Sequence, residues 1–130
     1  YNAELTDALC AEVAQRLRSF GALECLTFLE GLSRLRASLP EDMQRDDSET
    51  VAAVAGQLSR SMDSLGARDL IRAFTTLVRL DHYDRRLVHV RLCTALAQKL
   101  DQLQGPALFA DLAELLHCLS LLPAQSHSPG

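Results

Sequence analysis

The chain has 130 residues, of which 48% are apolar, and its formal charge at neutral pH is −4. This length suffices for one domain that removes roughly two-thirds of its unfolded surface from water. No stretch reaches the roughly 18 uninterrupted apolar residues that a membrane-spanning helix needs, and the negative total excludes a protein that is basic over its whole surface.

Three segments of the chain are versions of one pattern, in which a glycine-containing turn precedes Leu, Ile and Phe residues three and four positions apart. They occupy residues 20–35, 65–80 and 103–119. This spacing is typical of a helix with one buried face. Upstream of each segment a second apolar series repeats at separations of 45 and 38 residues. The repeated unit is therefore a pair of helices, used three times.

The pattern predicts an all-α fold, an α-solenoid of three helical hairpins with about six helices and a repeat of about 38 residues. Such units cannot bury their apolar faces alone and must stack on their neighbours. The hairpins are predicted at about residues 4–38, 48–81 and 84–122. Together they form one helical-repeat domain over residues 1–123, followed by a disordered tail at 124–130.

The first hairpin is predicted to consist of helices at about residues 6–19 and 22–38. Thr6 or Asp7 is the expected N-cap of the first helix. The second helix ends before Pro40, because the residue before a proline is kept out of the helical conformation. The expected core residues are Leu9, Val13, Leu17, Phe20, Leu26, Leu29, Leu32 and Leu35.

An acidic inter-repeat loop at residues 39–47 follows the first hairpin and accounts for the longer first spacing. Asp47 or Ser48 is the expected N-cap of the next helix. Gly66 separates that helix from one at about residues 67–80. The expected core residues of this second hairpin are Val51, Val54, Leu58, Met62, Leu70, Phe74 and Leu77.

The third hairpin follows a short connector, and Asp84 is the expected N-cap of its first helix. Pro106 fits the first turn of the last helix, at about residues 106–122, and Pro123 ends it. The expected core residues are Val88, Leu92, Leu96, Leu100, Leu108, Leu112, Leu115 and Leu119.

The sequence offers no set of residues for catalysis or for binding a metal or cofactor. Gly-rich phosphate loops, GxSxG and HExxH are absent. Glu114 and His117 have the spacing of a di-metal carboxylate ligand pair. The matching positions in the second hairpin are Thr76 and Arg79, which favours a solvent-facing pair. We therefore expect no enzyme activity, no cofactor and no small-molecule substrate.

The four cysteines fall inside helical patterns at mostly apolar positions and form no CxxC pair. They are Cys10, Cys25, Cys93 and Cys118. This placement favours small buried thiols in a reducing compartment over a disulfide framework or a zinc site.

The cations are concentrated in the second hairpin and its exit. Twelve of the thirteen are arginines, and residues 66–100 have a net charge of +4. Guanidinium groups suit phosphates and stack on bases, while a GC-rich genome would produce the same excess of Arg. The predicted RNA-binding residues are Arg68, Arg72, Arg79, Arg85, Arg86 and Arg91.

The segment LGARDLIRAFTTLVRLDHYD, residues 65–84, resembles the octotricopeptide and heptatricopeptide repeats of organelles and the related repeats of FAST-kinase-type proteins. Leu65 to Leu70 follow the opening of those repeats and Ala73 to Leu80 their close, whereas the frequent Trp of that close is absent. The resemblance implies a module without catalysis that binds RNA or scaffolds a ribonucleoprotein. It also implies a mitochondrial protein, with another organelle or the cytoplasm as alternatives.

The alternative function is a protein-interaction module in a large assembly, with no direct RNA contact. The negative net charge and the scarcity of aromatic residues favour this alternative, while the Arg excess and the resemblance favour RNA. Neither function requires a membrane.

Overall fold

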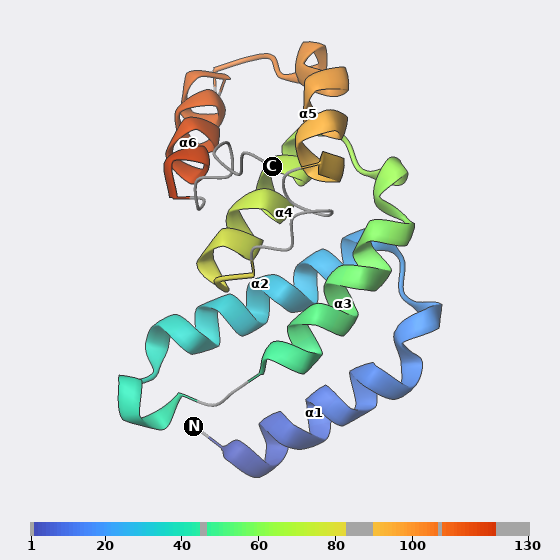
Figure 1. Ribbon diagram of the computed structural model, residues 1–130, viewed down its shortest axis with the longest axis vertical. Helices are drawn as coiled ribbons and strands as arrows, with labels where there is room; N and C mark the ends of the chain where they lie inside the picture. The colour runs from blue at the N-terminus through green and yellow to red at the C-terminus, as the bar shows by residue number, and fades with distance from the viewer. Residues whose placement is uncertain (1, 45–46, 83–89, 107, 122–130) are drawn as a thin grey trace, which may run out of the picture. The chain divides into compact units, whose positions relative to one another are not determined.

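The computed structural model describes residues 2–44, 47–82, 90–106 and 108–121, and these residues form helices joined by short connectors (Figure 1). No β-strand occurs in these four ranges, and the all-α prediction is confirmed. The α-helices are α1 (Ala3–Arg16), α2 (Ala22–Ser38), α3 (Ser48–Arg60), α4 (Ala67–Arg79), α5 (Cys93–Lys99) and α6 (Leu108–Leu121).

The contacts within the chain divide it into two compact units, which we call unit 1 (residues 1–65) and unit 2 (residues 66–130). Unit 1 contains α1, α2 and α3, and unit 2 contains α4, α5 and α6. The boundary falls inside the second predicted hairpin, residues 48–81. The stacking of three hairpins into a solenoid therefore stays a prediction.

In unit 1, α3 packs against both α2 and α1, as Figure 1 shows. The predicted apolar stripe of α3 is confirmed, because Val51, Val54 and Leu58 are all buried. On α2, the expected core residues Leu26, Leu29 and Leu32 are buried, and Leu35 is half-buried. The core of unit 1 thus lies mainly between these two helices.

The expected core of the first helix is wrong at Leu9, which is exposed, while its neighbour Cys10 is buried. The reason is that α1 packs against α3, so only the side of α1 that meets α3 is buried. The spacing of apolar residues does not say which side of the helix this is. The expected N-cap is also wrong. The helix begins earlier, and the cap is Asn2, whose Oδ1 accepts a hydrogen bond from the Leu5 N–H at 2.9 Å.

The first helix of each predicted hairpin is followed by a 3₁₀ turn and then by one extended residue. These turns are η1 (Leu17–Ser19), η3 (Met62–Ser64) and η5 (Leu100–Gln102). The next residue, Phe20, Leu65 or Leu103, is extended, and its N–H donates to the carbonyl of the first residue of the turn at 3.0 or 3.1 Å. The backbone therefore repeats at the same separations as the apolar pattern.

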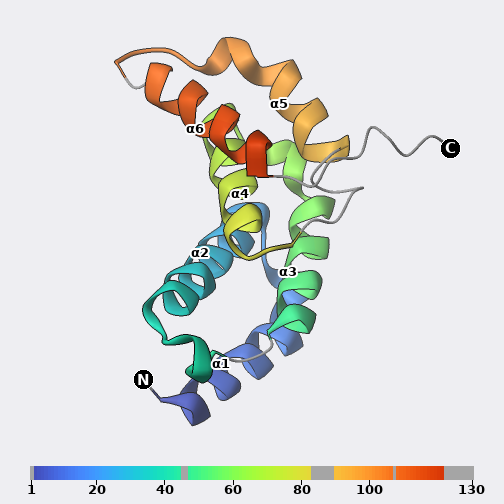
Figure 2. The ribbon, with the colours of Figure 1, turned by 60° about the vertical axis from the view of Figure 1, so that its left-hand side comes forward.

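In unit 2, α4 packs against α6 and α5, and the two views agree on this arrangement (Figure 2). The predicted core residues Leu70, Phe74 and Leu77 are all fully buried. The first N–H group of α4 has no partner within the helix, and Gln102 supplies one. The Gln102 Oε1 accepts a hydrogen bond from the Ala67 N–H at 2.9 Å. The helix is the central element of unit 2.

The expected core of the last helix is wrong at Leu119. On α6, Leu119 is exposed, and the other three expected residues are only half-buried, whereas Cys118 is buried. Cys118 Sγ lies 3.3 Å from Thr75 Oγ1 of α4, so this side of α6 faces the core of unit 2. Leu92, just before α5, and Leu96, on α5, are buried as expected, but Leu100, in η5, is exposed.

Several expectations concern residues outside the described ranges. They are the cap Asp84, the core residue Val88 and the tail at 124–130. Within the described residues, no helix has the length and apolar character needed to cross a membrane.

Candidate functional site

Three of the predicted RNA-binding residues lie on α4, namely Arg68, Arg72 and Arg79. Arg91 lies just before α5, in a π-helical stretch at residues 90–92, and is exposed. Arg85 and Arg86 fall outside the described residues.

Each arginine of α4 has a carboxylate partner within unit 2. Arg68 Nη2 lies 3.0 Å from Asp111 Oδ2, and Arg79 Nη2 lies 3.5 Å from Glu114 Oε1, so both pairs join α4 to α6. Arg72 Nη1 lies 2.8 Å from Asp69 Oδ1, one turn away on α4. These three cations and three anions cancel one another locally.

The two pairs between helices are weak links. Arg68 and Arg79 keep more than half of their side chains exposed, and exposed pairs contribute only about 0–1 kcal/mol each. The Asp111 Oδ2 atom is buried and makes no aligned hydrogen bond, so its pairing with Arg68 is electrostatic. The sequence analysis missed both partners, because the pairing depends on how α6 lies against α4.

The Glu114 and His117 pair is not part of a metal site in the described part of the chain. Glu114 is engaged by Arg79, and His117 is exposed. No group of three His, Cys, Asp or Glu side chains in the described ranges is arranged to hold a metal ion. His117 is exposed, as predicted for a solvent-facing pair, whereas Glu114 is half-buried.

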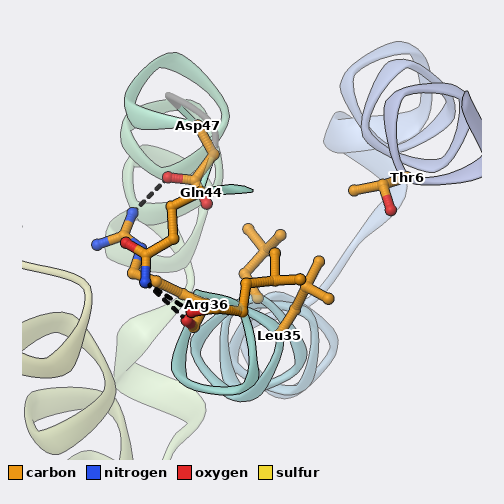
Figure 3. A pocket seen from close by; sticks show the side chains of 7 residues that line it. Thr6, Leu35, Arg36, Gln44 and Asp47 are labelled. Carbon is orange, nitrogen blue, oxygen red and sulfur yellow. Dashed lines mark hydrogen bonds and ion pairs between the residues drawn. The ribbon is translucent and has the colours of Figure 1, made fainter. Parts of the chain in front are cut away.

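A small hollow in unit 1 lies between α1, α2 and the acidic loop (Figure 3). It has room for about one water molecule, which is far too little for a substrate or cofactor. Its lining residues are Thr6, Leu32, Leu35, Arg36, Leu39, Gln44 and Asp47.

The polar residues of the hollow bind one another and fasten the acidic loop to α2. Asp47 forms an ion pair with Arg36. Gln44 Nε2 donates to the carbonyl oxygens of Arg36 and Leu39 at 3.0 and 3.3 Å, and so satisfies groups that a helix end leaves without partners. Asp47 is the N-cap residue of α3, as predicted, but its carboxylate serves Arg36 and not the helix. The residues around the hollow therefore have a structural role, which is to hold the acidic loop against α2.

Among the described helices, α6 has the most large apolar side chains that are exposed. Phe109, Leu112, Leu116 and Leu119 follow one another at intervals of three or four residues, so they share one side of the helix, which we call the α6 face. Phe109 and Leu116 are strongly exposed, Leu119 is exposed and Leu112 is half-buried. The face contains no charged residue. Large exposed apolar patches are uncommon on monomeric proteins, which makes the α6 face a candidate interaction surface.

The four cysteines form no disulfide. Cys10, Cys25 and Cys118 are buried as predicted, and Cys93 is half-buried. Burial raises the pKa of the Cys25, Cys93 and Cys118 thiols above their ordinary value of 9.0. The thiolate, which is the reactive form, is therefore disfavoured in the folded chain.

We expect Cys25, Cys93 and Cys118 to react with a disulfide reagent at pH 8 several times more slowly in the native protein than in urea. Because the folded pKa lies above the unfolded value, the thiols favour the folded state fully below about pH 9. This contribution is lost as the pH rises through the folded pKa. Thiol counting with time and urea unfolding at pH 7 and pH 10 check both effects. Equal rates in native and unfolded protein would contradict the buried thiols.

No known family model, curated protein sequence or solved structure matches this chain. Its function is therefore argued from the geometry of unit 1 and unit 2.

Proposed function

We propose that this chain is a helical-repeat module without catalysis that binds protein subunits of a larger assembly. The observation that carries the proposal is the α6 face, where Phe109 and Leu116 are exposed on a side of the helix that has no charged residue. Large aromatic and aliphatic side chains are the residues that protein interfaces bury at their centre. In this proposal the three hairpins stack as an α-solenoid, whose open ends are contact surfaces.

The charge arrangement of unit 2 supports a protein partner over a nucleic acid. Of the six predicted RNA-binding residues, the three on α4 are already paired with Asp69, Asp111 and Glu114. Binding of a phosphate backbone is driven by unpaired cations that release counterions from it. A surface of matched pairs supplies little of this driving force.

RNA binding in an organelle, mitochondrial in the first instance, is the second candidate. It is favoured by the net charge of +4 over residues 66–100 and by the exposure of Arg68, Arg79 and Arg91. In this case phosphates take the place of Asp111 and Glu114, and the contacts position the RNA without reading its sequence.

The test is to purify the tagged full-length protein from its own cells, with and without ribonuclease, and to compare Phe109→Glu with the wild type. We expect the co-purifying assembly to survive ribonuclease and to be lost in Phe109→Glu, because a charge on the α6 face opposes burial. Ala110→Glu is the matched control, since Ala110 is exposed on α6 outside that face. Quantitative mass spectrometry of the bound proteins is the measurement.

The opposite pattern would replace the first proposal with the second. An assembly that ribonuclease dissolves, and that Phe109→Glu leaves intact, would identify RNA as the partner. Loss of the same assembly in Arg68→Ala/Arg79→Ala would then place the RNA on α4.

A further inference from the structure

The 3₁₀ turns η1, η3 and η5 recur at the spacing of the apolar pattern, so positions of α2, α4 and α6 can be compared by that spacing. The helix α6 begins five residues after Leu103, whereas α2 and α4 begin two residues after Phe20 and Leu65. Leu26, Ile71 and Phe109 occupy the same repeat position, six residues after Phe20, Leu65 and Leu103. The exposed fraction is 0% for Leu26 and 4% for Ile71, but 82% for Phe109. The same repeat position is thus buried on α2 and α4 but exposed on α6.

A second position of the repeat changes in the same way. Val78 on α4 is 4% exposed, while its equivalent on α6, Leu116, is 67% exposed. Both exposed residues belong to the α6 face. The difference therefore concerns one side of the helix and not a single side chain.

The helices in which these positions are buried have equivalent packing partners. The next helix in the chain packs on each of them, α3 on α2 in unit 1 and α5 on α4 in unit 2. Both covering helices are the first helices of a following hairpin. Within the described residues, α6 packs chiefly against α4, and no first helix follows it.

The first helices of the hairpins also share an apolar position that is buried in two of them and exposed in the third. Leu9, Val54 and Leu92 are equivalent, eleven residues before Phe20, Leu65 and Leu103. Val54 and Leu92 are 1% and 0% exposed, but Leu9 on α1 is 54% exposed. In unit 1, α1 packs against α3, and Leu9 and Leu5 lie together on an open side.

We propose that the α6 face binds the Leu5 and Leu9 side of α1 in a second copy of this chain. This contact repeats between molecules the pairing that α2 makes with α3 and α4 makes with α5. The proposal rests on the proposed function, since it names a second copy as one of the protein subunits bound. The two surfaces differ, so the association is head-to-tail and extends with concentration.

The test uses the whole chain in sedimentation velocity over a series of concentrations. We expect the wild type to self-associate, and Phe109→Glu and Leu9→Glu each to weaken association roughly tenfold or more. Ala110→Glu and Ala11→Glu are the matched controls, since both alanines are exposed on the same helices away from these faces. Unchanged helical circular dichroism shows that each variant is folded.

Mixing the two variants decides whether the contact is head-to-tail. Phe109→Glu retains an intact α1 and Leu9→Glu retains an intact α6 face, so an equimolar mixture is expected to form a one-to-one dimer and no larger species. A wild type that stays monomeric throughout would overturn the proposal, and so would a dimer that the mixture fails to restore. In either case, loss of the cellular assembly in Phe109→Glu would still stand as support for the proposed function.

Discussion

Replacing Phe74 with alanine is expected to lower the free energy of unfolding of unit 2 by about 3–5 kcal/mol. Phe74 is fully buried on α4, the helix against which both α5 and α6 pack. The change removes the transfer free energy of an aromatic side chain and leaves a cavity that neighbouring helices fill only in part. Because small domains are stable by only about 5–15 kcal/mol, this single change consumes a large share of the total.

The matched control for this prediction is Phe109→Ala, the same chemical change on α6. Phe109 is largely exposed, so its replacement should alter the free energy of unfolding by no more than about 0.5 kcal/mol. Urea unfolding followed by circular dichroism measures both. Equal destabilisation by the two changes would mean that Phe109 is covered in the monomer, and the α6 face would then not be available to a partner.

Replacing Arg36 with alanine is expected to destabilise unit 1 by about 2–4 kcal/mol. Asp47 is buried to 7% exposure and is paired with Arg36, whose side chain is 24% exposed. Without the guanidinium, the carboxylate stays buried beside α3 with no opposite charge, and a buried unpaired charge costs far more than the pair contributes. The acidic loop also loses its ionic link to α2.

A double-mutant cycle separates the unpaired charge from the loss of packing. Arg36→Ala/Asp47→Ala is expected to be more stable than Arg36→Ala, because no charge is left buried. Arg16→Ala serves as an exposed reference. Its partner Glu12 lies 2.6 Å away on α1, both side chains are more than half exposed, and the cost should stay within about 0.5 kcal/mol. If Arg36→Ala and Arg16→Ala cost the same, the pair at the acidic loop has no structural role.

Periodicity in the sequence predicted the central helices well. The core residues of α3 and α4 repeat every three or four positions, and those named in advance, such as Val54, Leu58 and Phe74, are buried. These helices have neighbours on several sides, so most of their apolar residues find cover whichever way the helix is turned. The repeat itself was also visible in the sequence, and the three 3₁₀ connectors follow its spacing.

The outer helices were predicted less well, for a related reason. On α1 and α6 the apolar residues span more of the circumference than the neighbouring helices cover. As a result, Cys10 and Cys118 are buried, while their neighbours Leu9 and Leu119 are exposed. Periodicity shows that a helix has an apolar face, but it cannot say which part of a broad face meets a partner.

For the candidate sites too, one part could be predicted from the sequence and another part could not. The Arg excess on α4 could be read from the sequence, but the carboxylates that neutralise Arg68 and Arg79 come from α6, more than 30 residues later. Charge counted along the chain does not report such pairs, because they form only when two helices are placed side by side. The ion pair between Arg36 and Asp47 was not predicted for the same reason.

The sequence by itself determined that this protein is built of helices, where most of them lie, and that their pattern occurs three times, because helix propensity and apolar spacing are local properties of the chain. The tertiary structure alone decided which apolar residues are buried and which remain on the surface. That choice depends on the neighbours that each helix meets, and it leaves Phe109 exposed where its equivalents Leu26 and Ile71 are covered.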